Sequence, residues 1–394
     1  MAKIHGTERE RALITALKLR YHDGGGNQPG DLAFAKAMTV LAARYADDKQ
    51  IGTIAANGWL MSGPNTPEGQ ELDSKIAMPM LERILALDPN YTPAIHFYIH
   101  ASEGAGEPAK AEQYADKLAR LAPMASHLIH MPSHTYYWVG RYEDAAKANM
   151  RAVELGIENA KRLGLPPPDG IWSLPYHSHN VTFGIGGSLM SGDSTIGLAL
   201  ARPLVTRAAA READSTPMIF SLLGYAAMAE FAPPTEVLAL AEPKSPYIRN
   251  SWHYARGEVF ARQGNLAGLR AETAGIQGIP GPTSRDDGTF QAAQVPLIAR
   301  AVLTGRAAMI EHRFEDAAAS FREAAELQEN SDFRAFSDPP VWWYPVRRDL
   351  AAALLASGNR TAAREDLEAS LKLWPRDPVA LALLSTLETR APAR

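Results

Sequence analysis

Two histidine pairs recur in this chain at a fixed interval. His96 and His100 are four residues apart, as are His130 and His134, and the second pair follows the first by 34 residues. Residues four apart lie on one face of an α-helix, so each pair would present two imidazoles from a single helix. Imidazole is a ligand for zinc, copper and iron. The spacing therefore predicts a metal site formed by the equivalent helices of two neighbouring repeats.

Further potential ligands lie close to the two pairs. Glu103 follows His100 by three residues, on the same helical face, and His127 precedes His130 by three. The predicted ligands are His96, His100, Glu103, His127, His130, His134 and His179. A network of hydrogen-bonded histidines that binds no metal is the alternative. Pro132 predicts either a kink in a helix that starts near Ser126 or a helix that starts later, near Met131 or Pro132.

The 34-residue interval is typical of the tetratricopeptide repeat (TPR), a helix–turn–helix unit that stacks on copies of itself. The second helix of such a unit carries a small–x3–large–x2–small pattern, because small residues allow close helix packing and the large one fills the gap. Matches begin at Ala77, Ala111 and Ala145, and again at Ala317 and Ala363. We therefore predict an all-α fold, a TPR-like α-solenoid of helix–turn–helix repeats. The motif Gly184-x-Gly186-Gly187 is expected to allow close helix packing.

The pattern predicts one TPR-like superhelix over residues 1–394. Its histidine-rich site region is expected at 90–185 and its C-terminal TPR units at 297–390. Gly- and Pro-rich segments interrupt the helical pattern at residues 61–69, 163–175, 277–289 and 337–340. We expect these loops to cover the concave face; simple connectors are the alternative.

Composition narrows the function. Lys and Arg number 40 against 44 Asp and Glu, a net charge of −4, so a nucleic acid or an anionic membrane is not an expected partner. The absence of cysteine excludes thiolate ligands, disulfides and a cysteine nucleophile. No apolar run approaches the roughly 20 residues of a membrane span. The N-terminus lacks a signal-peptide pattern, so we expect a cytoplasmic protein as the chain stands, or a periplasmic one if a leader was removed.

Several sequence blocks resemble a bacterial family of TPR-containing proteins, over roughly residues 9–387. The blocks are AIHFYIHASE at 94–103, HLIHMPSH at 127–134, SHN at 178–180, HYARG at 253–257 and DPP at 338–340 with the following Trp343. Members carry an extra helical segment before the point where this chain starts. They commonly have tyrosine at the position of His177, which makes His179 the better match, and glutamate at that of Asp338.

The resemblance implies a fold and a site, but no particular reaction. We expect a substrate pocket formed by His253, Tyr254, Arg256, Asp338 and Trp343.

A site rich in imidazole and poor in carboxylate favours copper, with iron or zinc as alternatives. The leading hypothesis is a metal-dependent oxidoreductase that uses oxygen at a mono- or dinuclear site and acts on a small molecule or peptide. Glu103 and His177 are its predicted catalytic groups, with Glu103 either a ligand or the group that orients His100. The alternatives are a non-catalytic TPR scaffold for a protein or peptide partner, a zinc hydrolase with Glu103 as general base, and a metal carrier without turnover.

Overall fold

The computed structural model describes residues 6–64, 66–211, 220–279, 289–334 and 339–389. In these ranges all regular secondary structure is helical, and no β-strand is present. The chain divides into two compact units, residues 1–135 (the first unit) and residues 136–394 (the second unit). A single superhelix over residues 1–394 stays a prediction.

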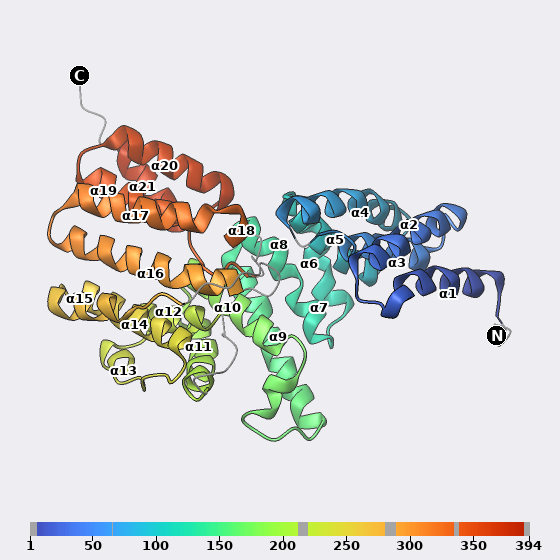
Figure 1. The fold of residues 1–394 in the computed structure, drawn as a ribbon, viewed down its shortest axis with the longest axis horizontal. Helices are drawn as coiled ribbons and strands as arrows, with labels where there is room; N and C mark the ends of the chain where they lie inside the picture. Colours follow the sequence, from blue (N-terminus) through green and yellow to red (C-terminus); the bar gives the residue numbers. More distant parts are fainter. Residues whose placement is uncertain (1–5, 65, 212–219, 280–288, 335–338, 390–394) are drawn as a thin grey trace. The chain divides into compact units, whose positions relative to one another are not determined.

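The first unit is a series of helices, most of which pack against the next helix along the chain. Figure 1 shows them in blue to cyan. They are α1 (Glu8–Arg20), α2 (Gln28–Arg44), α3 (Lys49–Leu60), α4 (Pro67–Leu87), α5 (Thr92–Gly104), α6 (Glu112–Leu121), α7 (Ser126–His130) and the start of α8 (Pro132–Trp138), with 3-10 turns η1 (His22–Gly24) and η2 (Pro108–Ala111). Side chains of Asn27, Asp48 and Thr66 cap α2, α3 and α4 by accepting backbone N–H groups.

The second unit continues in the same manner, and α14, α16, α17, α19 and α20 pack in succession (Figure 1). Its helices are α9 (Tyr142–Arg162), α10 (His177–Ser191), α11 (Ser194–Ala209), α12 (Ser221–Phe231), α13 (Pro234–Leu238), α14 (Pro246–Arg262), α15 (Leu266–Gly275), α16 (Thr289–Ile310), α17 (Phe314–Glu329), α18 (Ser331–Arg334), α19 (Arg347–Ala356), α20 (Arg360–Leu373) and α21 (Pro378–Thr389), with the 3-10 turn η3 (Gly170–Ser173).

The residues that carry the repeat pattern lie in the helix contacts. The small residues Ala77, Ala145, Ala317 and Ala363 are fully buried, on α4, α9, α17 and α20. The large position is buried as well, as Phe321 on α17 illustrates. Small residues at these positions bring paired helices close enough for the large side chain to fill the space between them. The predicted fold class, an all-α TPR-like solenoid of helix–turn–helix repeats, is confirmed.

Helices α9 and α10 meet at a glycine. A Cβ atom on Gly187 would lie 2.8 Å from the backbone nitrogen of Ala146 and 2.9 Å from the carbonyl oxygen of Tyr142, both on α9. Backbone atoms cannot move aside as a flexible side chain can, so any larger residue would separate the two helices. The role predicted for this glycine-rich motif is confirmed at Gly187.

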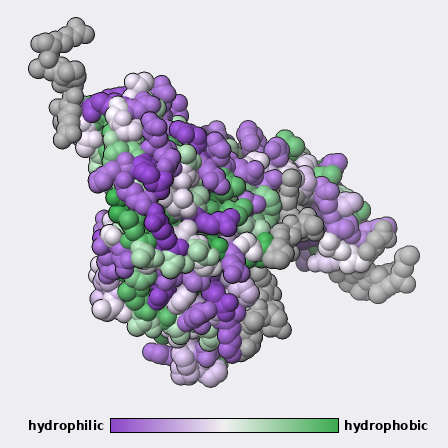
Figure 2. Space-filling view, turned by 60° about the vertical axis from the view of Figure 1, so that its left-hand side comes forward, coloured by the Kyte–Doolittle hydropathy of each residue, from purple (hydrophilic) through white to green (hydrophobic). Residues whose placement is uncertain are grey.

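The four loops expected over a concave face are only partly within the described residues, since 280–288 and 335–338 lie outside them; their covering role stays a prediction. Figure 2 shows hydrophilic and apolar residues interspersed over the face in view, the usual condition of a protein surface. Among the described helices, none has the length and apolar character needed to cross a membrane.

Candidate metal centre

Helix α5 places His96, His100 and Glu103 on one face, as their spacing predicted. The helix starts at Thr92 with Pro93 in its first turn, where the missing N–H of proline costs no hydrogen bond. The three side chains are half-buried. They therefore lie within the helix packing of the first unit without being sealed from water.

The facing histidines come from two short helices separated at Met131. α7 holds His127 and His130, and α8 begins at Pro132 and holds His134. Met131 keeps helical dihedral angles, and its N–H donates to the carbonyl oxygen of His127. Because proline cannot donate a hydrogen bond and its ring crowds the preceding turn, the helix is interrupted there. The structure combines the two alternatives, because a helical segment starts at Ser126 and includes His127 and His130, and a separate helix starts at Pro132.

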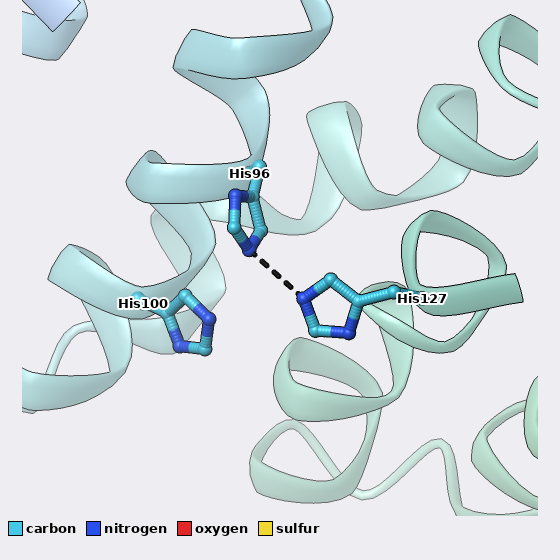
Figure 3. Close-up of side chains that lie close together, drawn as sticks. All are labelled: His96, His100 and His127. Atoms are coloured by element: carbon cyan, nitrogen blue, oxygen red, sulfur yellow. Dashed lines mark hydrogen bonds between the residues drawn. The ribbon is translucent and has the colours of Figure 1, made fainter. Parts of the chain in front are cut away.

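Five imidazoles of the first unit form a closed ring, called the histidine cluster below. Successive ring centroids are 5.1 Å apart for His96–His127, 5.7 Å for His127–His130, 4.8 Å for His130–His134, 4.8 Å for His134–His100 and 5.1 Å for His100–His96. Figure 3 shows three of them turned toward one another across the two helices. The cluster brings together every predicted histidine ligand of the first unit.

Two contacts within the histidine cluster join ring nitrogens directly. Nε2 of His96 lies 3.2 Å from Nε2 of His127 (Figure 3), and Nε2 of His130 lies 2.9 Å from Nε2 of His134. The potential ligand atoms of His96, His100 and His127 all lie within 4.8 Å of one another, as do those of His100, Glu103 and His134. Groups at these separations can converge on an ion.

Two side chains outside the ring hold its members in place. The Nδ1 atom of His134 lies 2.9 Å from Oε2 of Glu103, and Nδ1 of His130 lies 3.3 Å from Oγ of Ser133. A carboxylate on the far nitrogen of an imidazole is the usual arrangement behind a metal-bound histidine, since it fixes the tautomer and the ring orientation. The sequence predicted this orienting role for Glu103 toward His100, which stays a prediction; the contact with His134 was not predicted. Ser133 was missed, although it lies inside the HMPSH block.

The environment keeps His96 and His127 of the histidine cluster uncharged. His130 and His134 are fully buried. Burial, with the neighbouring histidines, lowers the pKa of His96 to about 4, and burial and His134 lower that of His127 to about 4. Both rings are therefore neutral near pH 7, and only the neutral ring has a lone pair for a metal.

The second unit contains the other two histidines of the predicted site, both on α10. The ring of His179 contacts that of Phe183 at 5.0 Å between centroids; its place in the ligand set stays a prediction. His177 is buried, with its ring 4.6 Å from that of Trp172, and burial and the charge of Arg207 lower its pKa to about 4. Its catalytic role also stays a prediction.

The residues of the predicted substrate pocket have defined partners. His253 and Arg256 on α14 share Glu272 of α15: Nδ1 of His253 is 2.7 Å from its Oε2, and Nε of Arg256 donates to its Oε1 at 2.7 Å. Tyr254 is buried, and its ring lies 6.1 Å from that of Trp343. Asp338 lies outside the described residues, and the pocket stays a prediction. Nothing in the sequence near α14 pointed to Glu272, because the contact joins two helices.

No protein-family model matches the chain, and no curated protein matches it. Among solved structures, yeast Tom70 is similar at 12% identity, over 97% of this chain and 89% of that one, with a TM-score of 0.28. The TPR domain of P58(IPK) is similar at 11% identity, over 97% of this chain and 98% of that one, with a TM-score of 0.26. At such scores the superposition carries no argument, and the fold class rests on the helices of this chain.

Proposed function

We propose that this TPR-like protein binds a transition metal in the histidine cluster of its first unit. The observation that carries the proposal is the ring of five imidazoles. In two of its neighbouring pairs the ring nitrogens are in direct contact. Gathering uncharged imidazoles inside a protein leaves ring nitrogens facing one another, and a cation between them satisfies their lone pairs. The Glu103 carboxylate behind His134 adds to the argument, because outer partners of this kind orient metal-binding histidines.

The donor set favours copper, with iron or zinc as alternatives. Imidazole suits all three ions, whereas magnesium and calcium require oxygen ligands. Glu103 is the carboxylate nearest to the histidine cluster among the predicted ligands, and it contacts a histidine. This supply of carboxylate oxygen is small for a non-haem iron site of the two-histidine, one-carboxylate kind.

The finer form of the proposal is an oxidoreductase in which a copper or iron ion activates oxygen and a small molecule or peptide is oxidised. Three imidazoles on one ion would leave a coordination position for oxygen or substrate. A zinc hydrolase with Glu103 as general base is the variant without redox chemistry. Oxygen consumption and visible spectra of the copper-loaded protein separate these two forms.

The second candidate is a non-catalytic scaffold for a protein or peptide partner. The repeat fold favours it, because helical solenoids present extended surfaces to partners whether or not they hold a metal. This candidate fits the fold at least as well as catalysis does. It predicts that partner binding persists after the metal has been removed.

Metal analysis by mass spectrometry tests the metal proposal on full-length protein prepared without a histidine tag. We expect about one or two equivalents of copper, iron or zinc. His100→Ala should reduce that content, since His100 lies between the two halves of the histidine cluster. The matched control is His22→Ala, at an exposed histidine of the same unit. Protein that neither contains nor takes up any of these ions would refute the metal proposal and leave the scaffold.

A further inference from the structure

The two nitrogen–nitrogen contacts each have the span of two ligands on one ion. Nitrogens about 2.0–2.1 Å from a common ion lie roughly 2.9 Å apart at a right angle and about 3.4 Å apart at a tetrahedral angle. The His130–His134 distance is 2.9 Å and the His96–His127 distance is 3.2 Å. Both distances therefore fall close to the range expected of two nitrogens bound to one ion.

The two contacts are directed to different positions. His127 and His130, one from each pair, have stacked rings with planes 24° apart and centroids 5.7 Å apart. An imidazole lone pair lies in the plane of its ring, so stacked rings direct their lone pairs side by side rather than to one point. A single ion between all four rings would require at least one of these two to turn.

Outer contacts prepare His134 for an ion. Its Nδ1 atom lies 2.9 Å from the Glu103 carboxylate, which accepts hydrogen bonds, so the ring proton belongs on Nδ1 and the lone pair on Nε2. That lone pair faces Nε2 of His130. Without metal, His130 donates its Nε2 proton to His134. With metal, the His130 proton belongs on Nδ1, where Oγ of Ser133 at 3.3 Å accepts it. An ion at this position would therefore change the tautomer of His130 without net proton release.

The ion position between His96 and His127, the first position, has a third ligand within reach. The potential ligand atoms of His96, His100 and His127 lie within 4.8 Å of one another. Three imidazoles and an open position are the usual complement of a catalytic zinc ion. The second position, between His130 and His134, has these two imidazoles from the first unit.

We infer that the histidine cluster holds two metal ions, one bound by His96, His127 and His100 and the other by His130 and His134. The inference rests on the proposed metal function and specifies its form.

Calorimetric titration of the metal-free, full-length protein with Zn²⁺ alone tests it. We expect two equivalents. Paired substitutions should each remove one: His96→Asn with His127→Asn leaves one equivalent, and His130→Asn with His134→Asn leaves the other. Asparagine keeps a polar group in the buried positions, and far-UV circular dichroism checks that each variant is folded. The control His22→Ala should bind two.

The outcomes separate the two claims. A single equivalent in the unaltered protein, or loss of all binding in the His96/His127 variant, would overturn the two-ion inference while preserving a metal site. No binding at all would overturn both. If the variant of the fully buried pair fails to fold, the half-buried His96/His127 pair decides the question, since a fall from two equivalents to one is expected there.

Discussion

Replacing Glu103 by glutamine tests the carboxylate that holds His134. The change keeps the size of the side chain and leaves a carbonyl oxygen that accepts from Nδ1, but it removes the negative charge. The contact is 2.9 Å long, His134 is fully buried and the Glu103 side chain is only 16% exposed. Water therefore screens this interaction far less than it screens an ion pair on the surface.

The expected cost follows from the hydrogen bond that is weakened. A hydrogen bond to a charged group contributes about 1.5–3 kcal/mol and a neutral one about 1 kcal/mol. The difference, roughly 0.5–2 kcal/mol, weakens the metal-bound form, in which His134 carries more positive charge. We expect the affinity for the ion that His134 binds to fall roughly tenfold. This is within the 10–100-fold range typical when a hydrogen-bond partner of a metal ligand is changed.

Competition for Zn²⁺ with a chromophoric chelator measures this change. Glu107→Gln is the matched control, because Glu107 lies just beyond the same helix, is 46% exposed and pairs with Lys110. An affinity within twofold of the unaltered protein for Glu103→Gln, or an equal loss for Glu107→Gln, would refute the orienting role. A loss far beyond 100-fold would identify Glu103 as a direct ligand instead.

Two further predictions concern the second unit. Gly187→Ala should lower the free energy of unfolding by roughly 1–3 kcal/mol in thermal denaturation. The control Gly156→Ala should be neutral or stabilising, because its Cβ would meet nothing closer than 3.7 Å. Equal effects of the two substitutions would contradict the close approach of α9 and α10. Burial raises the pKa of Glu272, but hydrogen bonds from His253 and Arg256 outweigh it and lower the pKa below 4.5. The ionised Glu272 therefore stabilises the fold above the pKa of the unfolded state, and this stabilisation is lost as the pH falls through the pKa of the folded state. Glu272→Gln should lower the free energy of unfolding in urea near pH 7 and lower it progressively less in acid. An effect independent of pH would count against this ion pair.

The fold was predictable because its signal is periodic. A small residue every 34 positions, as at Ala77, Ala111 and Ala145, records the same helix contact three times, and each of these side chains is fully buried. The histidine cluster was predictable for the same reason, since the repeat places His96 and His130 at equivalent positions of neighbouring helices.

Contacts without a period were not predictable. The contact between Glu103 and His134 depends on the rotation of α7 and α8, and the sequence did not predict it. The break before Pro132 depends on where the helix begins, which the residue pattern left open. Glu272 lies on a different helix from His253, and no local spacing connects them. In each case tertiary packing decides which side chains come into contact.

X-ray absorption of the metal-loaded, untagged protein tests most directly whether the histidine cluster binds metal. We predict a first shell dominated by imidazole nitrogen at about 2.0–2.1 Å, with the outer-ring scattering that imidazole produces, and a lower nitrogen count in the His96→Asn, His127→Asn variant. A shell of oxygen ligands that the substitutions leave unchanged would show that the metal lies elsewhere and would contradict the proposal.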